Sequence, residues 1–397
     1  MIRRWFALFV SVAIGWSETP EEILQRLSEI TGLKVIRKVD QQTMKRDQLK
    51  AYFEERIKEV VKPEEIRVEE LALKKLGFAP PDFDLKTTTV DLMTEQAAAF
   101  YDYRKKKMVL LDSSQGMLQD LALIHELAHA LADQHFNLEK FLRKAGANDD
   151  GALARMAVME GQATWLMSEF TAKNMGQSLL GSDSMVEMMS KMAGGGGSGF
   201  PVFESVPLYL RESLVFPYAK GMLFQHKVLA KSGKQGFAEV FRRPPQTTRE
   251  ILHPEIYFAK ATAEAPRLPD LARPKEWKQL SEGTVGEFDH KILLRQYAKE
   301  YESLAEAWRG GTYQLWEAKK DKRVALAYAT SWEDEAAARK FFDVYQQVLA
   351  AKWKRCEFGE RSAIRAVGHS EDGWFSVSLE GRGVASIEGL NALSDGR

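Results

Sequence analysis

The segment ALIHELAHAL, residues 122–131, places two histidines and a glutamate inside an otherwise apolar run. His125, Glu126 and His129 form the pattern H-E-x-x-H. Residues four apart lie about 40° apart around a helix axis, so both imidazoles project from one face, as two ligands of one metal ion require. Glu126 lies about 100° round the axis, where it can face the attacking water. The spacing therefore predicts a zinc site with Glu126 as the general base.

The competing interpretation is a pair of structural histidines in the core. The chain has seven histidines in 397 residues, and the pattern then arises by chance in roughly one such sequence in a hundred. Burying three ionisable groups on adjacent turns without a metal would cost several kcal/mol. These considerations favour the metal site.

A catalytic zinc needs a third protein ligand and an open position. A second helix, predicted from about 150 to 173, carries Glu160 on an apolar stripe, where a lone carboxylate requires a cation. Glu169 is the competing ligand, but it lies near the helix end, where a solvated glutamate needs no partner. We therefore expect one Zn²⁺ per chain, held by His125, His129 and Glu160, with a buried salt bridge as the alternative role for Glu160.

Several predicted elements position these residues. No glycine or proline occurs from 117 to 136, so the motif lies on a helix, with N-cap candidates at 112–114. The preceding AFYDYRKKKMVLLD predicts a hairpin, whose edge strand near Phe100–Tyr103 could pair with an extended substrate backbone. Further on, MVEMMSKMAGGGGSGFP predicts a core-facing methionine-rich helix and a flexible glycine loop, with a substrate lid as the alternative.

Composition restricts the class of protein. The 56 basic and 56 acidic residues cancel, so a nucleic-acid partner held by bulk electrostatics is not expected. The single cysteine, Cys356, permits no intrachain disulfide. Residues 1–17 have two arginines and a short apolar run, the layout of a secretory signal peptide. We therefore expect export to the periplasm or outside the cell, without stable membrane insertion after cleavage; a retained anchor is the second choice.

The expected fold class is α+β, in four segments. Residues 1–17 are the signal peptide, 18–84 a mostly helical N-terminal region with a short strand at 33–39, and 85–270 a zincin-like catalytic domain. A polar, proline-bearing linker then leads to a small α+β domain at 285–397, with a long helix at 290–308 and a Gly-Gly turn at 310–311.

The motifs HELAH, EGQA and AFYDY resemble those of the gluzincins, zinc metallopeptidases with a glutamate third ligand, of which thermolysin is the familiar member. The longer segments HELAHALADQHFNL, MEGQAT, FPYAKG and PPQTTREILHPEIY resemble a group of largely uncharacterised secreted prokaryotic metallopeptidases. This resemblance implies a fold and a zinc site but no substrate. Thr164 stands where thermolysin-like enzymes have an aspartate that orients a histidine ligand. Asp133 is a candidate for that role, with a solvated residue near the helix end as the alternative.

The resemblance also implies a His or Tyr that donates to the oxyanion formed during attack. His253 and Tyr257, in ILHPEIY, lie beyond the zinc helices and are candidates, His253 first. The alternative for His253 is a turn or surface residue. The four remaining histidines show no ligand spacing and are interpreted as structural or solvated: His135, His226, His290 and His369.

The sequence thus predicts an exported zinc metallopeptidase that acts on peptides or proteins, and it leaves the oligomeric state open. Two other classes remain. One is a non-catalytic binding module of the cell envelope with a structural or degenerate zinc site. The other is a zinc hydrolase of a non-peptide amide or ester, which uses the same chemistry.

Overall fold

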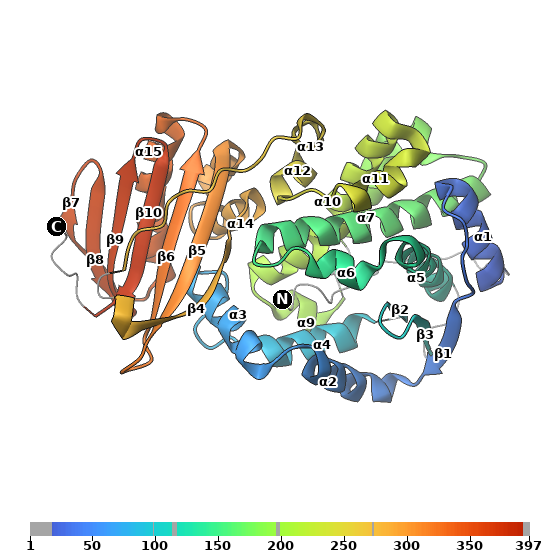
Figure 1. The fold of residues 1–397 in the computed structure, drawn as a ribbon, viewed down its shortest axis with the longest axis horizontal. Coiled ribbons are helices and arrows are strands. Elements are labelled where there is room, and N and C mark those ends of the chain that lie inside the picture. Colours follow the sequence, from blue (N-terminus) through green and yellow to red (C-terminus); the bar gives the residue numbers. More distant parts are fainter. Residues whose placement is uncertain (1–17, 98, 113–116, 196–198, 272–273, 392–397) are drawn as a thin grey trace.

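A helical part and a large β-sheet lie side by side in the computed structural model (Figure 1). The structure describes residues 18–391 apart from 98, 113–116, 196–198 and 272–273. The predicted signal peptide, the N-cap candidates at 113–114 and part of the glycine run therefore lie outside the described residues. The α+β class expected from the sequence is confirmed.

The helical part is built around two long helices, α7 (Asp149–Asn174) and α10 (Leu208–Ser232), which pack along each other. The side chain of Asn148 caps α7 by accepting from the backbone of Gly151 at 2.7 Å. The helices cross where Gly161 meets Gly221, because a Cβ on Gly161 would lie 2.1 Å from the carbonyl carbon of Gly221. Only glycine permits this close approach.

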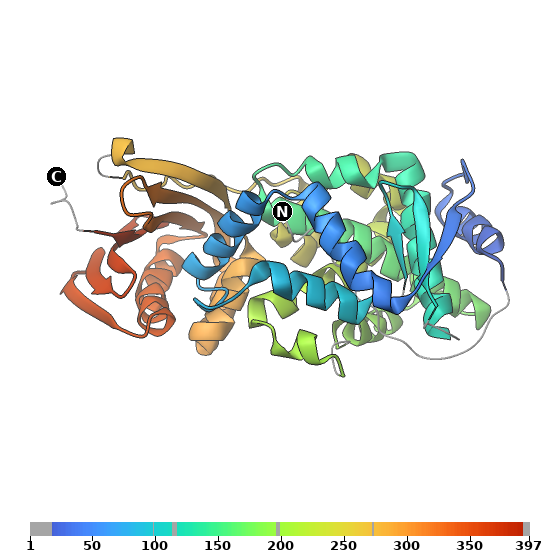
Figure 2. The same cartoon turned by 90° about the horizontal axis from the view of Figure 1, so that it is seen from below.

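The other helices of this part surround the pair (Figures 1 and 2). The helix with the H-E-x-x-H motif is α5 (Met117–Phe136), which packs on α7. The remaining helices are α1 (Pro20–Thr31), α2 (Leu49–Val60), α3 (Pro63–Lys75), α4 (Leu85–Gln96), α6 (Leu138–Arg143), α8 (Asp183–Gly194), α9 (Pro201–Ser205), α11 (Gly236–Arg242), α12 (Thr248–Leu252) and α13 (Pro254–Ala259).

A small sheet lies against α5. Its strands are β1 (Asp40–Met44), β2 (Ala99–Asp102) and β3 (Lys107–Leu111), in the order β1-β3-β2. The β2–β3 pair is the predicted antiparallel hairpin, and β2 is an outer strand of this sheet. The strand expected at 33–39 is wrong, because this segment pairs with no strand among the described residues. The backbone N–H groups of Ile36 and Arg37 donate to the side chain of Gln134 on α5 instead.

The C-terminal part is a seven-stranded antiparallel sheet in the order β4-β5-β6-β10-β9-β8-β7. Its strands are β4 (Trp277–Thr284), β5 (Trp308–Ala318), β6 (Val324–Trp332), β7 (Cys356–Arg361), β8 (Arg365–Ser370), β9 (Gly373–Glu380) and β10 (Gly383–Leu390). Helix α15 (Glu335–Lys352) packs on the central strands, and α14 (Glu287–Tyr297) connects β4 to β5 through a 3₁₀ helix, Lys299–Ala307.

Three features of the C-terminal part differ from the prediction. The C-terminal unit begins with β4 at Trp277 rather than at 285, because β4 pairs with β5. The expected Gly-Gly turn lies inside β5, and the long helix breaks at Ala298, whose φ of −154° is not helical. Residues 18–84 are mostly helical, as expected, and they contact the predicted catalytic segment, because β1 joins the sheet of β2 and β3 and α1 packs on α5.

The methionine-rich helix α8 is only half core-facing. Met185 and Met189 pack against the apolar cluster of α1, α5, α7 and α10, whereas Met188 and Met192 are 52% and 42% exposed. The prediction of a core-facing helix is therefore wrong for two of its four methionines. Within the described residues, none of the helices combines the length and the apolar character needed to cross a membrane.

Candidate metal centre

His125, His129 and Glu160 meet between α5 and α7. The Nε2 atoms of the two histidines lie 2.9 Å apart, and each lies 3.1 Å from Oε2 of Glu160. The structure thus brings together the two helical ligands predicted from spacing and the carboxylate predicted from an apolar stripe. Among the described residues, these three form the group of His, Cys, Asp and Glu side chains whose ligand atoms are close enough to hold one metal ion.

The donor set fits zinc. Two imidazole nitrogens and one carboxylate oxygen are ligands that Zn²⁺ binds at about 2.0–2.2 Å, which separates neighbouring ligands in a tetrahedral shell by about 3.3 Å. The observed separations of 2.9–3.1 Å are close to that value. The three side chains are all more than nine-tenths buried. A cation shared by them would explain why such polar groups lie in the core.

The surroundings of these side chains shift their pKa values. Burial lowers the pKa of His125 to about 4, which keeps that imidazole neutral. Burial also acts on Glu160, but the neighbouring His129 and the hydrogen bonds from both histidines outweigh it and lower the pKa of Glu160 to about 2. Glu160 is therefore an ionised carboxylate beside one neutral imidazole, that of His125. Burial opposes protonation of His129, but the neighbouring carboxylates, Glu160 first, outweigh it and raise the pKa of His129. A metal ion bound here would replace the proton of His129.

Glu126 lies beside this group and is not part of it. Its Oε2 accepts a hydrogen bond of 2.7 Å from the backbone N–H of Tyr101 on β2. Its Oε1 is buried and has no hydrogen-bond partner among the described residues. Burial raises the pKa of Glu126 to about 7. A carboxyl group with one oxygen fixed and the other available is suited to accept and return a proton near neutral pH.

Asp133, one turn beyond His129, holds the hairpin against α5. Its carboxylate accepts hydrogen bonds from the hydroxyl of Tyr101 at 3.0 Å, from Nζ of Lys106 at 2.7 Å and from the backbone of Leu138 at 2.9 Å. The alternative of a solvated residue near the helix end is wrong, because Asp133 is 4% exposed. None of these bonds involves a histidine, so they do not support the predicted role of Asp133 in orienting a histidine ligand. Asp133 instead binds the hydroxyl of Tyr101, whose backbone N–H donates to Glu126.

Two further polar residues of α7 have different surroundings. Glu169, the competing ligand, accepts from the hydroxyl of Ser178 and the backbone of Leu179 at 2.8 and 2.7 Å. Its side chain is therefore buried against the turn after α7 rather than solvated, and it lies outside the metal group. Thr164 is buried and its hydroxyl has no hydrogen-bond partner among the described residues. It therefore does not replace the aspartate that orients a histidine in thermolysin-like enzymes.

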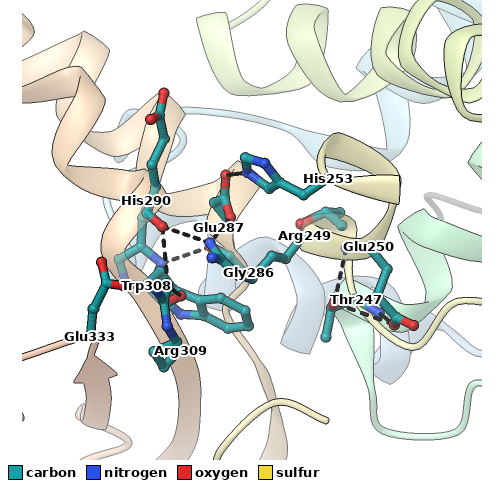
Figure 3. Close-up of polar contacts among 12 residues, drawn as sticks. Thr247, Arg249, Glu250, His253, Gly286, Glu287, His290, Trp308, Arg309 and Glu333 are labelled. Carbon is teal, nitrogen blue, oxygen red and sulfur yellow. Dashed lines mark hydrogen bonds and ion pairs between the residues drawn. The ribbon is translucent and has the colours of Figure 1, made fainter. Parts of the chain in front are cut away.

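His253 is not brought to the metal group. Its Nε2 lies 2.7 Å from Oε1 of Glu287, at the start of α14, and Arg249 contacts the other oxygen of the same carboxylate (Figure 3). Glu287 raises the pKa of His253 through this hydrogen bond. Tyr257 donates its hydroxyl to the carbonyl of Arg243 at 2.9 Å. Both candidate oxyanion donors are therefore engaged elsewhere, and their proposed role has no geometric support.

A tyrosine that the sequence analysis did not single out lies next to a ligand instead. The ring of Tyr218, on α10, stacks near His125 with centroids 5.9 Å apart and an angle of 24° between the planes. Tyr218 occurs in the segment FPYAKG, but a buried aromatic residue in a helix is indistinguishable from core by sequence pattern. Of the other histidines, His226 and His290 are buried in hydrogen bonds with Asp183 and Tyr328, as structural residues.

Residues 275–395 match the family model of a domain of unknown function, DUF8575. No curated protein and no solved structure matches the chain. The matched residues cover the seven-stranded sheet with α14 and α15 and include neither α5 nor α7. The C-terminal part is therefore similar to a recurring domain, and the candidate metal centre lies outside it.

Proposed function

We propose that the protein is a zinc-dependent metallopeptidase whose metal ligands are His125, His129 and Glu160. The observation that carries the proposal is the buried Oε1 of Glu126, which has no partner among the described residues and lies on the same helix as two of the ligands. A purely structural metal site would not need this carboxylate. The gluzincin resemblance of HELAH and EGQA supports the same assignment.

The chain's own residues divide the chemistry between them. When bound, Zn²⁺ supplies a Lewis acid that polarises the scissile carbonyl and acidifies the attacking water. Glu126 accepts a proton from that water as its oxygen attacks the carbonyl carbon, and returns the proton to the leaving nitrogen as the C–N bond breaks. The N–H of Tyr101 keeps the carboxylate oriented through both transfers. The depth of the site excludes bulk water from the reacting groups.

The decisive experiment is Glu126→Gln, assayed with a peptide that the zinc-loaded wild type cleaves. Glutamine keeps the size and can still accept from Tyr101, but it cannot accept the proton. We expect unchanged zinc content and a loss of kcat of roughly 10²–10⁴-fold. The matched control is Glu169→Gln, which alters another buried carboxylate outside the metal group and should leave zinc and turnover unchanged. Equal turnover of wild type and Glu126→Gln at equal zinc content would exclude this mechanism.

The Glu126→Gln variant also distinguishes a peptidase from a binding module and from a hydrolase of non-peptide substrates. A binding module would bind one partner equally well as wild type and as the Glu126→Gln variant, and would cleave nothing. A hydrolase of non-peptide amides or esters would respond to Glu126→Gln in the same way but on a different substrate panel. We also infer export from the layout of residues 1–17. N-terminal sequencing of the protein recovered from cell fractions tests that inference.

A further inference from the structure

A strongly basic surface surrounds the C-terminal end of α5. Three segments form it: residues 34–38, residues 103–107 in the turn of the β2–β3 hairpin, and residues 138–144 in and directly after α6. Together they carry ten basic residues and one acidic residue, Glu139. The whole chain has 56 basic and 56 acidic residues, so positive charge is concentrated here rather than spread evenly. We call this surface the basic face.

Two carboxylates hold the three segments together. Asp133 on α5 lies 2.7 Å from Nζ of Lys106 in the hairpin turn and 3.7 Å from the guanidinium of Arg37. Glu139 on α6 lies 2.9 Å from Nε of Arg104, which is also in the hairpin turn. The hairpin turn is therefore joined to the first segment through Asp133 and to the third through Glu139. The cations of all three segments act as one cluster.

Most of these cations face solvent with few acidic neighbours. The side chains of Lys34, Lys105 and Lys107 are exposed and form no ion pair among the described residues. Lys38 has one acidic neighbour, Glu21 on α1, at 3.7 Å, and both of these side chains are largely exposed. The basic face is therefore available to an anionic partner.

An exposed apolar side chain lies within the basic face. Ile36 is 62% exposed, and the chain places the exposed cations Lys34, Arg37 and Lys38 on either side of it. The side chain of Gln134 on α5 accepts from the backbone N–H groups of Ile36 and Arg37 at 2.7 and 3.1 Å, which fixes this segment in position. On a lipid surface such cations attract anionic headgroups while the apolar group enters the interface.

We propose that the basic face binds the surface of a membrane that contains anionic lipids, with Ile36 entering the headgroup region. This binding is peripheral and requires no spanning segment. The neutrality of the whole chain does not oppose it, because salt screens charges beyond about 8 Å at physiological ionic strength. The acidic residues elsewhere in the molecule therefore have little effect on this cluster.

This proposal does not depend on the proposed peptidase activity. If both are correct, the hairpin whose Tyr101 donates to Glu126 lies next to the lipid, and the candidate metal centre is held close to the membrane. An acidic protein is the competing partner, since it would also be attracted by the cations. It would not require Ile36, and this difference allows the two partners to be distinguished.

The first test is cosedimentation of the full chain with vesicles of phosphatidylglycerol and, separately, of phosphatidylcholine. We expect the affinity for the anionic vesicles to be at least tenfold higher, and to fall as salt is added. Equal affinity for the two kinds of vesicle, or binding to neither, would overturn the proposal.

The second test reverses two exposed charges on different segments of the basic face. Lys38→Glu combined with Lys105→Glu should lower the affinity for phosphatidylglycerol vesicles at least tenfold. The matched control combines Lys319→Glu with Lys320→Glu, because both lysines are exposed in the turn after β5. The two variants have the same net charge and the same residues 1–17, and thermal melting checks that both fold. An equal loss of affinity in both would refute a localised binding surface.

The third test distinguishes lipid from an acidic protein. Ile36→Ser removes the apolar group without changing the charge, and we expect the affinity for phosphatidylglycerol vesicles to fall about tenfold. Ile364→Ser is the matched control, since Ile364 is 58% exposed before β8 and lies outside the basic face. Its affinity should equal that of the wild type.

Polyglutamate serves as the probe for an acidic protein in the same test. Unchanged vesicle binding by Ile36→Ser would overturn the assignment to lipid. If polyglutamate then binds the wild type but not the variant with Lys38→Glu and Lys105→Glu, the basic face is a site for an acidic protein instead.

Discussion

The proposed ligands His125 and His129 contact each other as well as Glu160, so the loss of any one of them changes the surroundings of the other two. With Nε2 atoms 2.9 Å apart, the pair is stable only when a proton or a cation lies between the donors and Glu160. Removing Glu160 leaves two nitrogen donors in the core without a negative partner. Removing His129 leaves His125 and the carboxylate. Neither remainder supplies the three protein ligands of a catalytic zinc site.

We therefore expect His129→Ala and Glu160→Ala each to lower zinc affinity by at least 100-fold, measured by competition with a chromophoric chelator. His135→Ala is the matched control, because His135 lies on the same helix but hydrogen-bonds to the carbonyl of Lys34. It should retain one zinc per chain. Tight zinc binding by Glu160→Ala would move the third ligand to another residue.

For single residues, the sequence predicted those positions that depend only on local helix geometry and on burial. The spacing of His125 and His129 determines their direction on any helix, and a buried carboxylate such as Glu160 requires a partner wherever its helix packs. His253 could not be placed in this way, because its position depends on how α12 and α13 pack against α14. The burial of Asp133 and Glu169 was missed for a similar reason, since their donors come from distant segments or from the turn that follows.

Among the elements, the crossing of α7 and α10 determines where Glu160 lies. Gly161 follows the ligand directly and contacts the backbone of Gly221 on the opposite helix. Because a Cβ at either glycine would collide with backbone atoms, the two helices have to separate to accommodate one. The separation would move Glu160 relative to α5. The sequence contains both glycines, but nothing in their local context indicates that they face each other.

Gly161→Ala should therefore destabilise the protein although alanine is the better helix former. We expect a loss of about 1–3 kcal/mol in the free energy of unfolding, as for other overpacked core positions, together with weaker zinc binding. Gly194→Ala is the matched control, because its Cβ would lie 3.5 Å from that of Ala219, an ordinary contact. Urea unfolding of the two variants measures the difference. Equal free energies of unfolding for Gly161→Ala and Gly194→Ala would show that α7 and α10 can separate at their crossing without cost.

In the molecule as a whole, charged side chains join the helical part to the C-terminal sheet. His253 and Arg249 contact Glu287 (Figure 3), Arg67 on α3 contacts Glu317 on β5, and Lys75 contacts Asp372. The α+β class and the existence of a C-terminal unit were predicted from the succession of elements. The start of that unit was not, because the polar strand β4 has the composition of a linker and is recognised only by its pairing with β5.

The His253–Glu287 pair should make stability depend on pH. The folded state raises the pKa of His253 above its ordinary value of 6.5, so it binds the proton more tightly than the unfolded chain does. The stabilisation is therefore complete below pH 6.5 and is lost as the pH rises through the raised pKa. Below pH 6.5 we expect the free energy of unfolding of the wild type to exceed that of His253→Gln by about 1 kcal/mol or less, since the pair is partly exposed. This difference should disappear at higher pH.

Urea unfolding of both proteins between pH 5 and 9 measures this difference. His369→Gln, on β8 of the sheet, serves as the control and should follow the wild-type curve. A difference that grows as the pH rises would contradict the assigned direction of the pKa shift. Arg249 remains beside Glu287 in the His253 variant, so the buried carboxylate keeps one cation throughout.

The pairing of β1 with β3 also bears on the order in which the chain folds. Residues 40–44 pair in parallel with residues 107–111, and α2, α3, α4 and β2 all lie between them in the chain. Such a pairing closes a long loop, which slows its formation relative to the local β2–β3 hairpin. The hairpin that holds Glu126 can therefore form early, but its sheet is completed only after three helices have been placed. Zinc uptake during refolding should accordingly follow the recovery of helical signal rather than accompany it.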